Sequence, residues 1–275
     1  MAGMPAIDPM EQFMVHKIVA IPAVHVGGLT IDMSITNSVA SMLAGGLILM
    51  LFFAMTARRE IVPNRGQALA ESLYNIVDKT LVTPIIGVHG RPYIPYLFTL
   101  FSVILVLNLM GVLLSFLNVA GLSLTFTVTS QLAITATLAV LTFFSVFILG
   151  FVKHKHRFLG LFFPSGMGVI GAILMAPIEM ISYFVRPVTL AMRLFGNMMG
   201  GHVVMSLFGS FVVALAIVGL SGGLSTLAFI PSVLSFAMIV ALTGLELVVA
   251  VLQAFVFVAL ATVYLNEVVN FGHGH

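Results

Sequence analysis

The most restrictive feature of this sequence is a stretch over 92–152, in which 61 consecutive residues include no Asp, Glu, Lys or Arg. A helix needs about 20 mostly apolar residues to cross the hydrocarbon core of a bilayer. The stretch is therefore long enough for two spanning helices, which we expect over 94–117 and 127–152. Small and polar residues within 115–123 interrupt the apolar run and predict the break between them. These features predict an integral membrane protein.

Composition supports this interpretation and excludes several classes of protein. Charged residues make up 7% and hydrophobic residues 60% of the 275-residue chain, whereas a soluble domain has about 25% charged residues. A soluble globule, a disordered chain and a nucleic-acid binder are therefore excluded. The net charge of +2 is too small to make a basic binding surface. Because the sequence has no Cys, a disulfide framework, a thiolate metal site and a Cys nucleophile are excluded as well.

Basic residues predict the orientation of the chain in the membrane. A first span over 35–57 ends at a charged cluster, and both the loop 58–93 and the later loop 153–165 are rich in Lys and Arg. Short basic loops face the cytoplasm. The N-terminal segment 1–34, which lacks the features of a signal peptide, is therefore expected outside, and the tail 270–275 is expected in the cytoplasm.

The first basic loop, 58–93, contains a pattern typical of an amphipathic helix. Asn64 follows a proline and is a candidate N-cap residue. Apolar residues recur at helical spacing downstream of it, at Leu69, Leu73, Ile76, Val77 and Leu81. A helix of this kind either lies in the membrane interface or packs against another subunit, and the sequence leaves both alternatives open.

The C-terminal part, 166–269, contains two long apolar stretches that are separated near 220–223. At 1.5 Å per residue, about 50 helical residues extend about 75 Å, which is more than twice the roughly 30 Å of the hydrocarbon core. Each stretch is either a pair of short spans or one long helix. Because only weak turn signals lie within them, we favour two long helices. The predicted fold is an all-α integral membrane protein with five membrane-embedded helices and one interfacial amphipathic helix, the last two long and strongly tilted.

The two long helices also carry ionisable residues. A charge at the centre of a spanning helix costs about 2.5–3.5 kcal/mol even on a lenient scale, so such residues usually face a cavity or a partner charge. An isolated pair is as easily a structural salt bridge as a functional site. Five ionisable groups on two consecutive helices favour an ion pathway. They are Glu179, Arg186, Arg193, His202 and Glu246, with Asn197 and Gln253 as polar neighbours.

Helical spacing separates the expected roles of these residues. Glu179, Arg186 and Arg193 recur every seven residues and share one face, whereas His202 lies about 180° around the helical wheel from Arg193. Glu246 is the acid that we expect to be drawn to His202. Arg193 then has no permanent carboxylate within the chain, and it should find one on a partner or only intermittently.

Two segments of these helices resemble a known family. The signature of subunit a of the F-type ATP synthase membrane sector is similar to 186–198, which reads RPVTLAMRLFGNM. That family's last-helix motif resembles 252–257 and 263–265, which read LQAFVF and VYL. Five spans, an outside N-terminus and an interfacial segment also match the family's architecture, so the resemblance covers the whole chain.

The resemblance implies a stator subunit beside a ring of c subunits, with two offset half-channels that lead protons to and from the carboxylates of the ring. Arg193 would be the essential arginine at the interface with the ring, and Arg suits this role because it stays charged at any working pH. The half-channel on the outer side would include Asn197, His202, Glu246 and Gln253. The half-channel on the cytoplasmic side would include Glu179 and Ser182. Arg186 would have a supporting role in the motif.

The same resemblance implies partners and a location. The expected partners are the c ring, b-type peripheral stalk subunits and the rest of the F1Fo complex, in the inner membrane of a bacterium, with H⁺ as the ion. Many bacterial members carry Glu where this chain has His202 and His where it has Glu246. The exchange suggests that the two side chains work as a unit.

The alternative function is a self-contained, ion-coupled secondary transporter that uses the same ionisable residues. Such folds typically contain internal repeats, and the first half of the chain shows no second copy of the segment around Arg193. The sequence has no phosphate loop, nucleophile motif or metal-ligand cluster. We therefore expect no cofactor, no bound nucleotide or nucleic acid, and no catalysis by the chain alone. Glu267, near the end of the last helix, is expected to be a solvated interfacial acid.

Overall fold

A computed structural model describes most of the membrane-embedded chain. Several predicted features lie outside the described residues, namely most of the N-terminal segment, the charged cluster after the first span, the breaks near 117–123 and 221–223, most of the loop 153–165 and the tail beyond 270. The described residues are 17–19, 24–26, 29–31, 34–56, 62–116, 128–155, 158, 160, 169–220 and 227–270.

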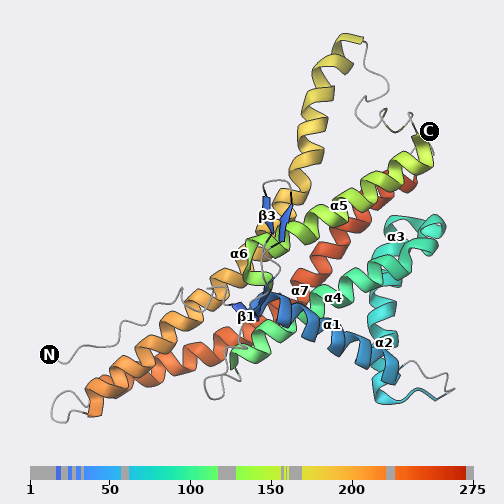
Figure 1. The fold of residues 1–275 in the computed structure, drawn as a ribbon. Helices are drawn as coiled ribbons and strands as arrows, with labels where there is room; N and C mark the ends of the chain where they lie inside the picture. Colours follow the sequence, from blue (N-terminus) through green and yellow to red (C-terminus); the bar gives the residue numbers. More distant parts are fainter. Residues whose placement is uncertain are drawn as a thin grey trace. The chain divides into compact units, whose positions relative to one another are not determined.

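Five helices of the described chain are long and apolar enough to cross a membrane, which confirms the predicted all-α membrane class. The last two have 52 and 41 residues, so each long apolar stretch forms one helix instead of a pair of short spans (Figure 1). The five helices are α1 Asn37–Thr56, α4 Ile94–Phe116, α5 Leu132–His154, α6 Val169–Leu220 and α7 Phe229–Val269.

Short helical segments fill the region between α1 and α4. The first of them begins where the sequence predicts a cap, because the side chain of Asn64 accepts a hydrogen bond of 2.7 Å from the backbone N–H of Arg65. The segments are α2 Arg65–Asn75, the π-helix η2 Ile76–Val82, α3 Thr83–Ile85 and the 3₁₀-helix η3 Gly87–Tyr93; another 3₁₀ turn, η4 Val128–Ser130, precedes α5.

The π-helix changes which apolar residues of this region are buried. Val77, Leu81 and Val82 are buried, whereas Leu69 and Ile76 are exposed. A π-helix bonds residues five apart instead of four, so the helical face defined by α2 does not continue through η2. The single apolar face predicted from regular α-helical spacing is therefore interrupted at Ile76.

Four short strands precede α1, and sequence reasoning did not predict them. Strands β1 Lys17–Val19 and β4 Ile35–Thr36 pair antiparallel, and β2 Val24–Val26 pairs antiparallel with β3 Leu29–Ile31. Each strand has at most three residues, which is too short for the alternation of apolar and polar side chains that announces a strand.

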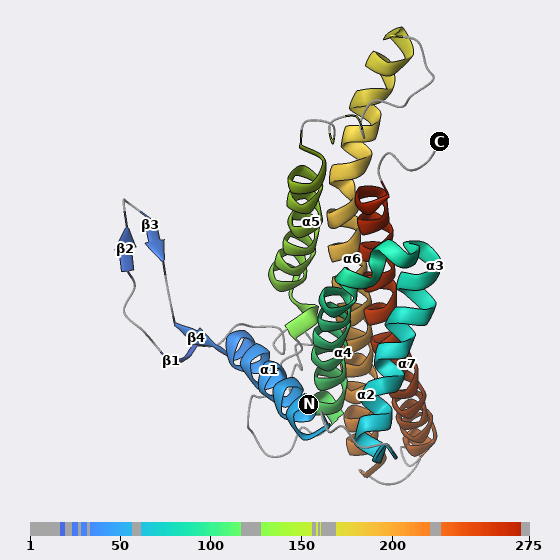
Figure 2. The ribbon, with the colours of Figure 1, turned by 90° about the vertical axis from the view of Figure 1, so that its right-hand side faces the viewer.

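The chain divides into two compact units, and each long helix except α5 contributes to both. The first unit consists of Met1–Gly45, Val106–Gln131 and Phe195–Leu252. Within it, α6 and α7 run antiparallel side by side (Figures 1 and 2), and the hydroxyl of Ser232 donates to the carbonyl of Val212. Helix α4 packs against both, because Val112 forms a buried cluster with Met198 and Ala250.

The second unit consists of Gly46–Leu105, Leu132–Leu194 and Gln253–His275. Here α5 and α7 end together, because Lys153 donates to the carbonyl of Val269 at 3.0 Å and the ring of His154 lies 2.8 Å from the carbonyl of Val268. The last carbonyl groups of a helix lack partners within the helix, and cations are favourable there. Lys153 and His154, which were expected in the loop 153–165, thus form the last turn of α5 and cover the carbonyl end of α7.

Candidate functional site

Two of the predicted site residues, His202 of α6 and Glu246 of α7, are in contact in the first unit. His202 Nε2 and Glu246 Oε1 are 3.5 Å apart, and the two side chains are only 3% and 5% exposed. The antiparallel packing of the two helices explains how residues so distant in sequence meet. The two residues that the sequence was expected to bring together thus lie next to each other in the structure.

The buried carboxylate of Glu246 lacks hydrogen bonds from the described residues. Neither of its carboxylate oxygens accepts a hydrogen bond from the described part of the chain. A buried polar group without hydrogen bonds costs about 1–3 kcal/mol, and a charged one costs more. Beyond its contact with His202, this carboxylate is thus suited to exchange partners, including a proton or a water molecule.

A small cavity of about 200 Å³ opens beside this pair. Two polar side chains line it, those of Asn197 and Glu246, and a liquid water molecule occupies about 30 Å³, so the cavity has room for several. The other lining residues are Gly201, Met205, Leu242, Leu245 and Val249. The cavity therefore gives Glu246 room for water molecules beside α6.

Gly201 makes the close approach of Glu246 to α6 possible. A Cβ atom at this position would lie 2.7 Å from Glu246 Oε1 and 3.2 Å from its carboxyl carbon. Any larger residue would therefore push the carboxylate away from its present position. The glycine that precedes His202 in the sequence is part of the site for a steric reason.

A second cluster, in the second unit, surrounds Arg186 of α6. Its Nη1 lies 2.5 Å from Oε2 of Glu267 on α7, and both side chains are about a quarter to a third exposed, at 25% and 30%. The guanidinium also lies 5.2 Å from the ring centre of Tyr183 and 5.1 Å from that of Tyr264. Both are cation–π distances. The expectation that Glu267 is merely solvated is wrong, because its partner lies on the preceding helix.

Arg193, also in the second unit, differs from Arg186 in its surroundings. Its side chain is exposed on α6, and within the described residues it forms no hydrogen bond and no ion pair. The sequence predicted that Arg193 lacks a permanent carboxylate in its own chain, and the described residues agree. Of the two arginines in α6, one is therefore paired internally and the other is available to a partner.

The other predicted site residues also lie on α6 and α7, but they do not form one cluster. Glu179 and Ser182 are exposed on α6 in the second unit, and Gln253 is buried on α7 in the same unit. Asn197 belongs to the first unit, where it lines the cavity beside Glu246. The structure thus brings Asn197, His202 and Glu246 together.

One polar residue near this site was missed by sequence reasoning. Asn108 is completely buried in α4, and its side-chain amide donates a hydrogen bond of 3.0 Å to the carbonyl of Ala250, one helical turn after Glu246. Its amide oxygen accepts no hydrogen bond from the described residues. The available signal was an amide in the middle of a span free of charged residues, since polar groups inside a membrane are usually retained for a partner.

Comparisons with known proteins give one consistent result. Residues 38–266 match the model of a family described as "ATP synthase A chain". The chain is 40% identical over 268 residues to "ATP synthase subunit a" of Rhodopseudomonas palustris (strain BisB18), covering 97% of this chain and all of the relative. It is 42% identical over 270 residues to the protein of the same name from Rhizobium johnstonii, covering 98% of this chain and 99% of the relative.

Proposed function

This chain belongs to the ATP synthase A chain family, and we propose that it forms the stationary proton path beside a rotating ring of c subunits. Members of this family are membrane components of the ATP synthase and are not enzymes by themselves. The chain accordingly serves ATP synthesis and proton transport as a multi-pass membrane subunit.

The observation that carries the proposal is the contrast between the two arginines of α6. Arg186 has Glu267 as a partner, whereas Arg193 is exposed and forms no ion pair within the described residues. An exposed arginine at membrane depth is costly unless it meets an opposite charge or water. A carboxylate carried past it on a neighbouring subunit supplies that charge intermittently.

In the proposed mechanism, Arg193 acts on each ring carboxylate in turn. It attracts the carboxylate that has released its proton, because Arg keeps its charge at any working pH. The same positive charge opposes the passage of a proton directly from one half-channel to the other. A proton can then cross the membrane only while it is bound to a ring carboxylate, as the ring makes a nearly complete turn.

The two half-channels use the other polar residues of α6 and α7. The buried pair of His202 and Glu246, beside its cavity, supports proton transfer on the outer side, with Asn197 and Gln253 as further polar groups of that path. On the cytoplasmic side, the exposed residues Glu179 and Ser182 receive protons from the ring. Arg186 supports this path by holding Glu267.

The surroundings of the subunit follow from the same proposal. Its partners are the c ring, b-type stalk subunits and the rest of the F1Fo complex, and its membrane is the inner membrane of a bacterium, as the bacterial relatives suggest. The N-terminus faces outside and the C-terminus the cytoplasm, because the two basic loops favour the cytoplasmic side. The ion is H⁺.

Replacement of Arg193 tests the proposal. Arg193→Ala should abolish ATP synthesis in membranes that hold the assembled complex, while passive proton leak through the membrane sector rises. The matched control is Met192→Ala, which truncates a neighbouring side chain that is 51% exposed on the same helix. Assembly is measured by the amount of each subunit that co-purifies.

Near-normal ATP synthesis with Arg193→Ala would refute the proposed role of this residue. A secondary transporter, the alternative function, would instead carry its ion when the purified chain is placed alone in liposomes. Membership of the ATP synthase family favours the stator.

A further inference from the structure

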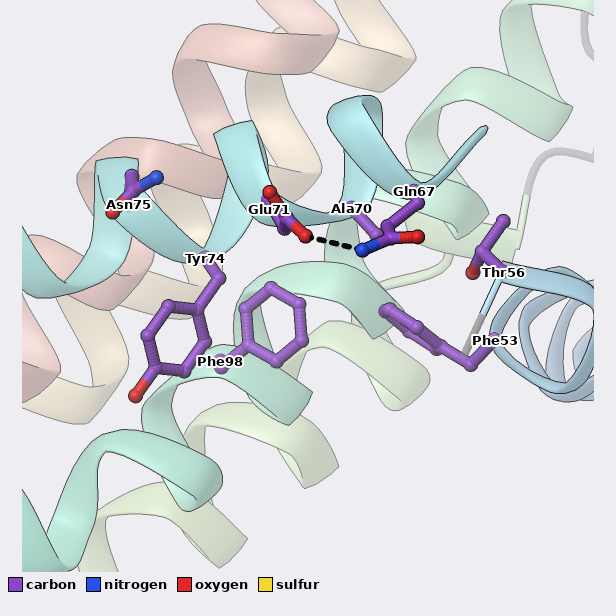
Figure 3. A pocket seen from close by; sticks show the side chains of 8 residues that line it. All are labelled: Phe53, Thr56, Gln67, Ala70, Glu71, Tyr74, Asn75 and Phe98. Atoms are coloured by element: carbon purple, nitrogen blue, oxygen red, sulfur yellow. Dashed lines mark hydrogen bonds between the residues drawn. The ribbon is translucent and has the colours of Figure 1, made fainter. Parts of the chain in front are cut away.

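A second cavity, remote in sequence from the ionisable residues of α6 and α7, lies in the second unit where α1 ends. It measures about 400 Å³ and lies among the last turn of α1, the amphipathic helix α2 and the first turns of α4. Figure 3 shows the side chains that surround it. The lining residues are Phe53, Thr56, Gln67, Ala70, Glu71, Tyr74, Asn75 and Phe98.

Three aromatic rings form one wall of this cavity. The ring centres of Phe53 and Phe98 are 5.4 Å apart, those of Tyr74 and Phe98 are 5.5 Å apart, and both pairs meet edge to face. Figure 3 shows the three rings in a row beneath α2. Aromatic faces attract cations, and grouped aromatic rings are the usual recognition element for ammonium groups.

A carboxylate also lines the cavity. Glu71 on α2 is exposed, and one of its oxygens accepts a hydrogen bond of 2.8 Å from the side-chain amide of Gln67 (Figure 3). This hydrogen bond fixes the direction of the carboxylate and leaves its other oxygen to a ligand. A carboxylate facing aromatic rings is complementary to a positively charged group of modest size.

The length of α1 predicts that the cavity lies at the level of the lipid headgroups. Helix α1 has 20 residues, which at 1.5 Å per residue extend about 30 Å and just cross the hydrocarbon core. Phe53 and Thr56, in its last turn, are therefore at the boundary of that core. Met50, which lies one turn before Phe53 on the same side of α1, is 70% exposed, and Leu47 beyond it is 57% exposed, so an apolar track leads from the cavity along α1.

We propose that this cavity binds the headgroup of a zwitterionic phospholipid, with its ammonium group between Glu71 and the rings of Phe53, Tyr74 and Phe98. One acyl chain of the lipid lies along the exposed side of α1. The bound lipid fills the space between the end of α1 and α2, and it ties the amphipathic helix to the membrane surface. This binding site is independent of the proton path.

Charge and position favour such a lipid over other occupants. An anionic phospholipid without an ammonium group would place a phosphate near Glu71, where like charges repel. A lysine of a neighbouring subunit has the right charge, but it would leave the exposed apolar flank of α1 unexplained. A phospholipid with an ethanolamine or choline headgroup satisfies both the polar and the apolar parts of the site.

Photo-labelling of the assembled complex in nanodiscs tests the proposal. A trace of phosphatidylethanolamine with a photoreactive acyl chain is cross-linked, the labelled peptides are mapped, and unlabelled phosphatidylethanolamine, phosphatidylcholine or phosphatidylglycerol is added as competitor. We expect labels on peptides around residues 50–56 and 95–99. We also expect the two zwitterionic lipids to compete about fivefold better than phosphatidylglycerol, as one exposed ion pair between Glu71 and the ammonium group predicts.

Variants of the cavity sharpen this experiment. Glu71→Gln should reduce the fivefold preference to near parity, whereas Tyr74→Phe, which keeps the ring, should preserve it. The matched control is Asp78→Asn, which removes one negative charge from the adjoining π-helix outside the cavity. Should Glu71→Gln fail to assemble, the competition between lipids on the unaltered complex decides alone.

Three results would overturn the proposal. The first is equal competition by phosphatidylglycerol and the zwitterionic lipids in the unaltered complex. The second is an unchanged preference after Glu71→Gln. The third is labelling that appears only after neighbouring subunits are removed, which would show that a protein side chain fills the cavity.

Discussion

At the scale of single residues, His202 and Glu246 show how the site depends on pairing. They are buried 3.5 Å apart, so the charge of one affects the ionisation of the other. His202→Glu alone would place two acids together, and Glu246→His alone would leave two bases. Each single change should lower ATP-driven proton pumping about tenfold, which corresponds to about 1.4 kcal/mol on the limiting barrier.

The double exchange is the informative variant. His202→Glu combined with Glu246→His restores one acid and one base, and it should recover part of the lost pumping. Pumping is followed in inverted membrane vesicles with equal amounts of assembled complex. If the loss of pumping in the double variant equals the sum of the losses in the two single variants, the two residues act independently.

Gly201 allows a second prediction at this scale. Gly201→Ala adds a Cβ atom 2.7 Å from Glu246 Oε1, so the carboxylate must move, and proton pumping should fall several-fold without loss of assembly. Gly209→Ala on the same helix is the control, because nothing lies within 4 Å of its Cβ position. Equal pumping by the two variants would remove Gly201 from the site.

Part of the site was readable from single residues, and part was not. The pairing of His202 with Glu246 follows from two antiparallel helices, because the two residues lie at similar distances from the connection between α6 and α7. The pairing of Arg186 with Glu267 was missed, because an acid near the end of the last helix is equally well explained by water. Such a contact joins residues 81 apart in sequence, and only the packing of α6 against α7 selects it.

At the scale of elements, the cluster around Arg186 fixes α6 against α7 in the second unit. Arg186→Ala removes the ion pair with Glu267 and the contacts with two tyrosine rings. We expect a loss of about 1–2 kcal/mol of stability, since the pair is partly exposed and the ring contacts add to it. Arg186→Lys keeps the charge and should lose less.

Thermal unfolding of the detergent-purified complex measures this loss. The expected order of midpoint temperatures is the unaltered chain, then Arg186→Lys, then Arg186→Ala. Glu267→Gln, which keeps the shape of the partner but not its charge, should lie near Arg186→Ala. Identical midpoints for all four proteins would show that the cluster does not hold the helices together.

The elements differ in how far the sequence predicts them. Membrane-spanning helices are predictable because an apolar run of sufficient length has few other stable structures in a bilayer. The π-helix after α2 was not predictable, since residues such as Leu69 and Ile76 fit a regular α-helical face equally well. The strands before α1 were missed because two or three residues carry no usable period.

At the scale of the whole molecule, the proposed function of the chain is complete only with a second subunit. The chain itself supplies a buried acid–base pair and an exposed arginine without an internal carboxylate. It contains no Cys, so an introduced cysteine is its only thiol. Cross-linking to the ring can therefore be assigned to one position.

The most direct test of the central claim is cross-linking from the face of α6 that carries Arg193. Gly196→Cys lies close to that face and has open space at its Cβ position, whereas Val188→Cys is 59% exposed but lies about 140° around the helix from Arg193. With a second cysteine beside the ring carboxylate, Gly196→Cys should form a disulfide with the c subunit and Val188→Cys should not. Cross-linking from Val188→Cys alone would contradict the account, because Arg193 would then face away from the ring.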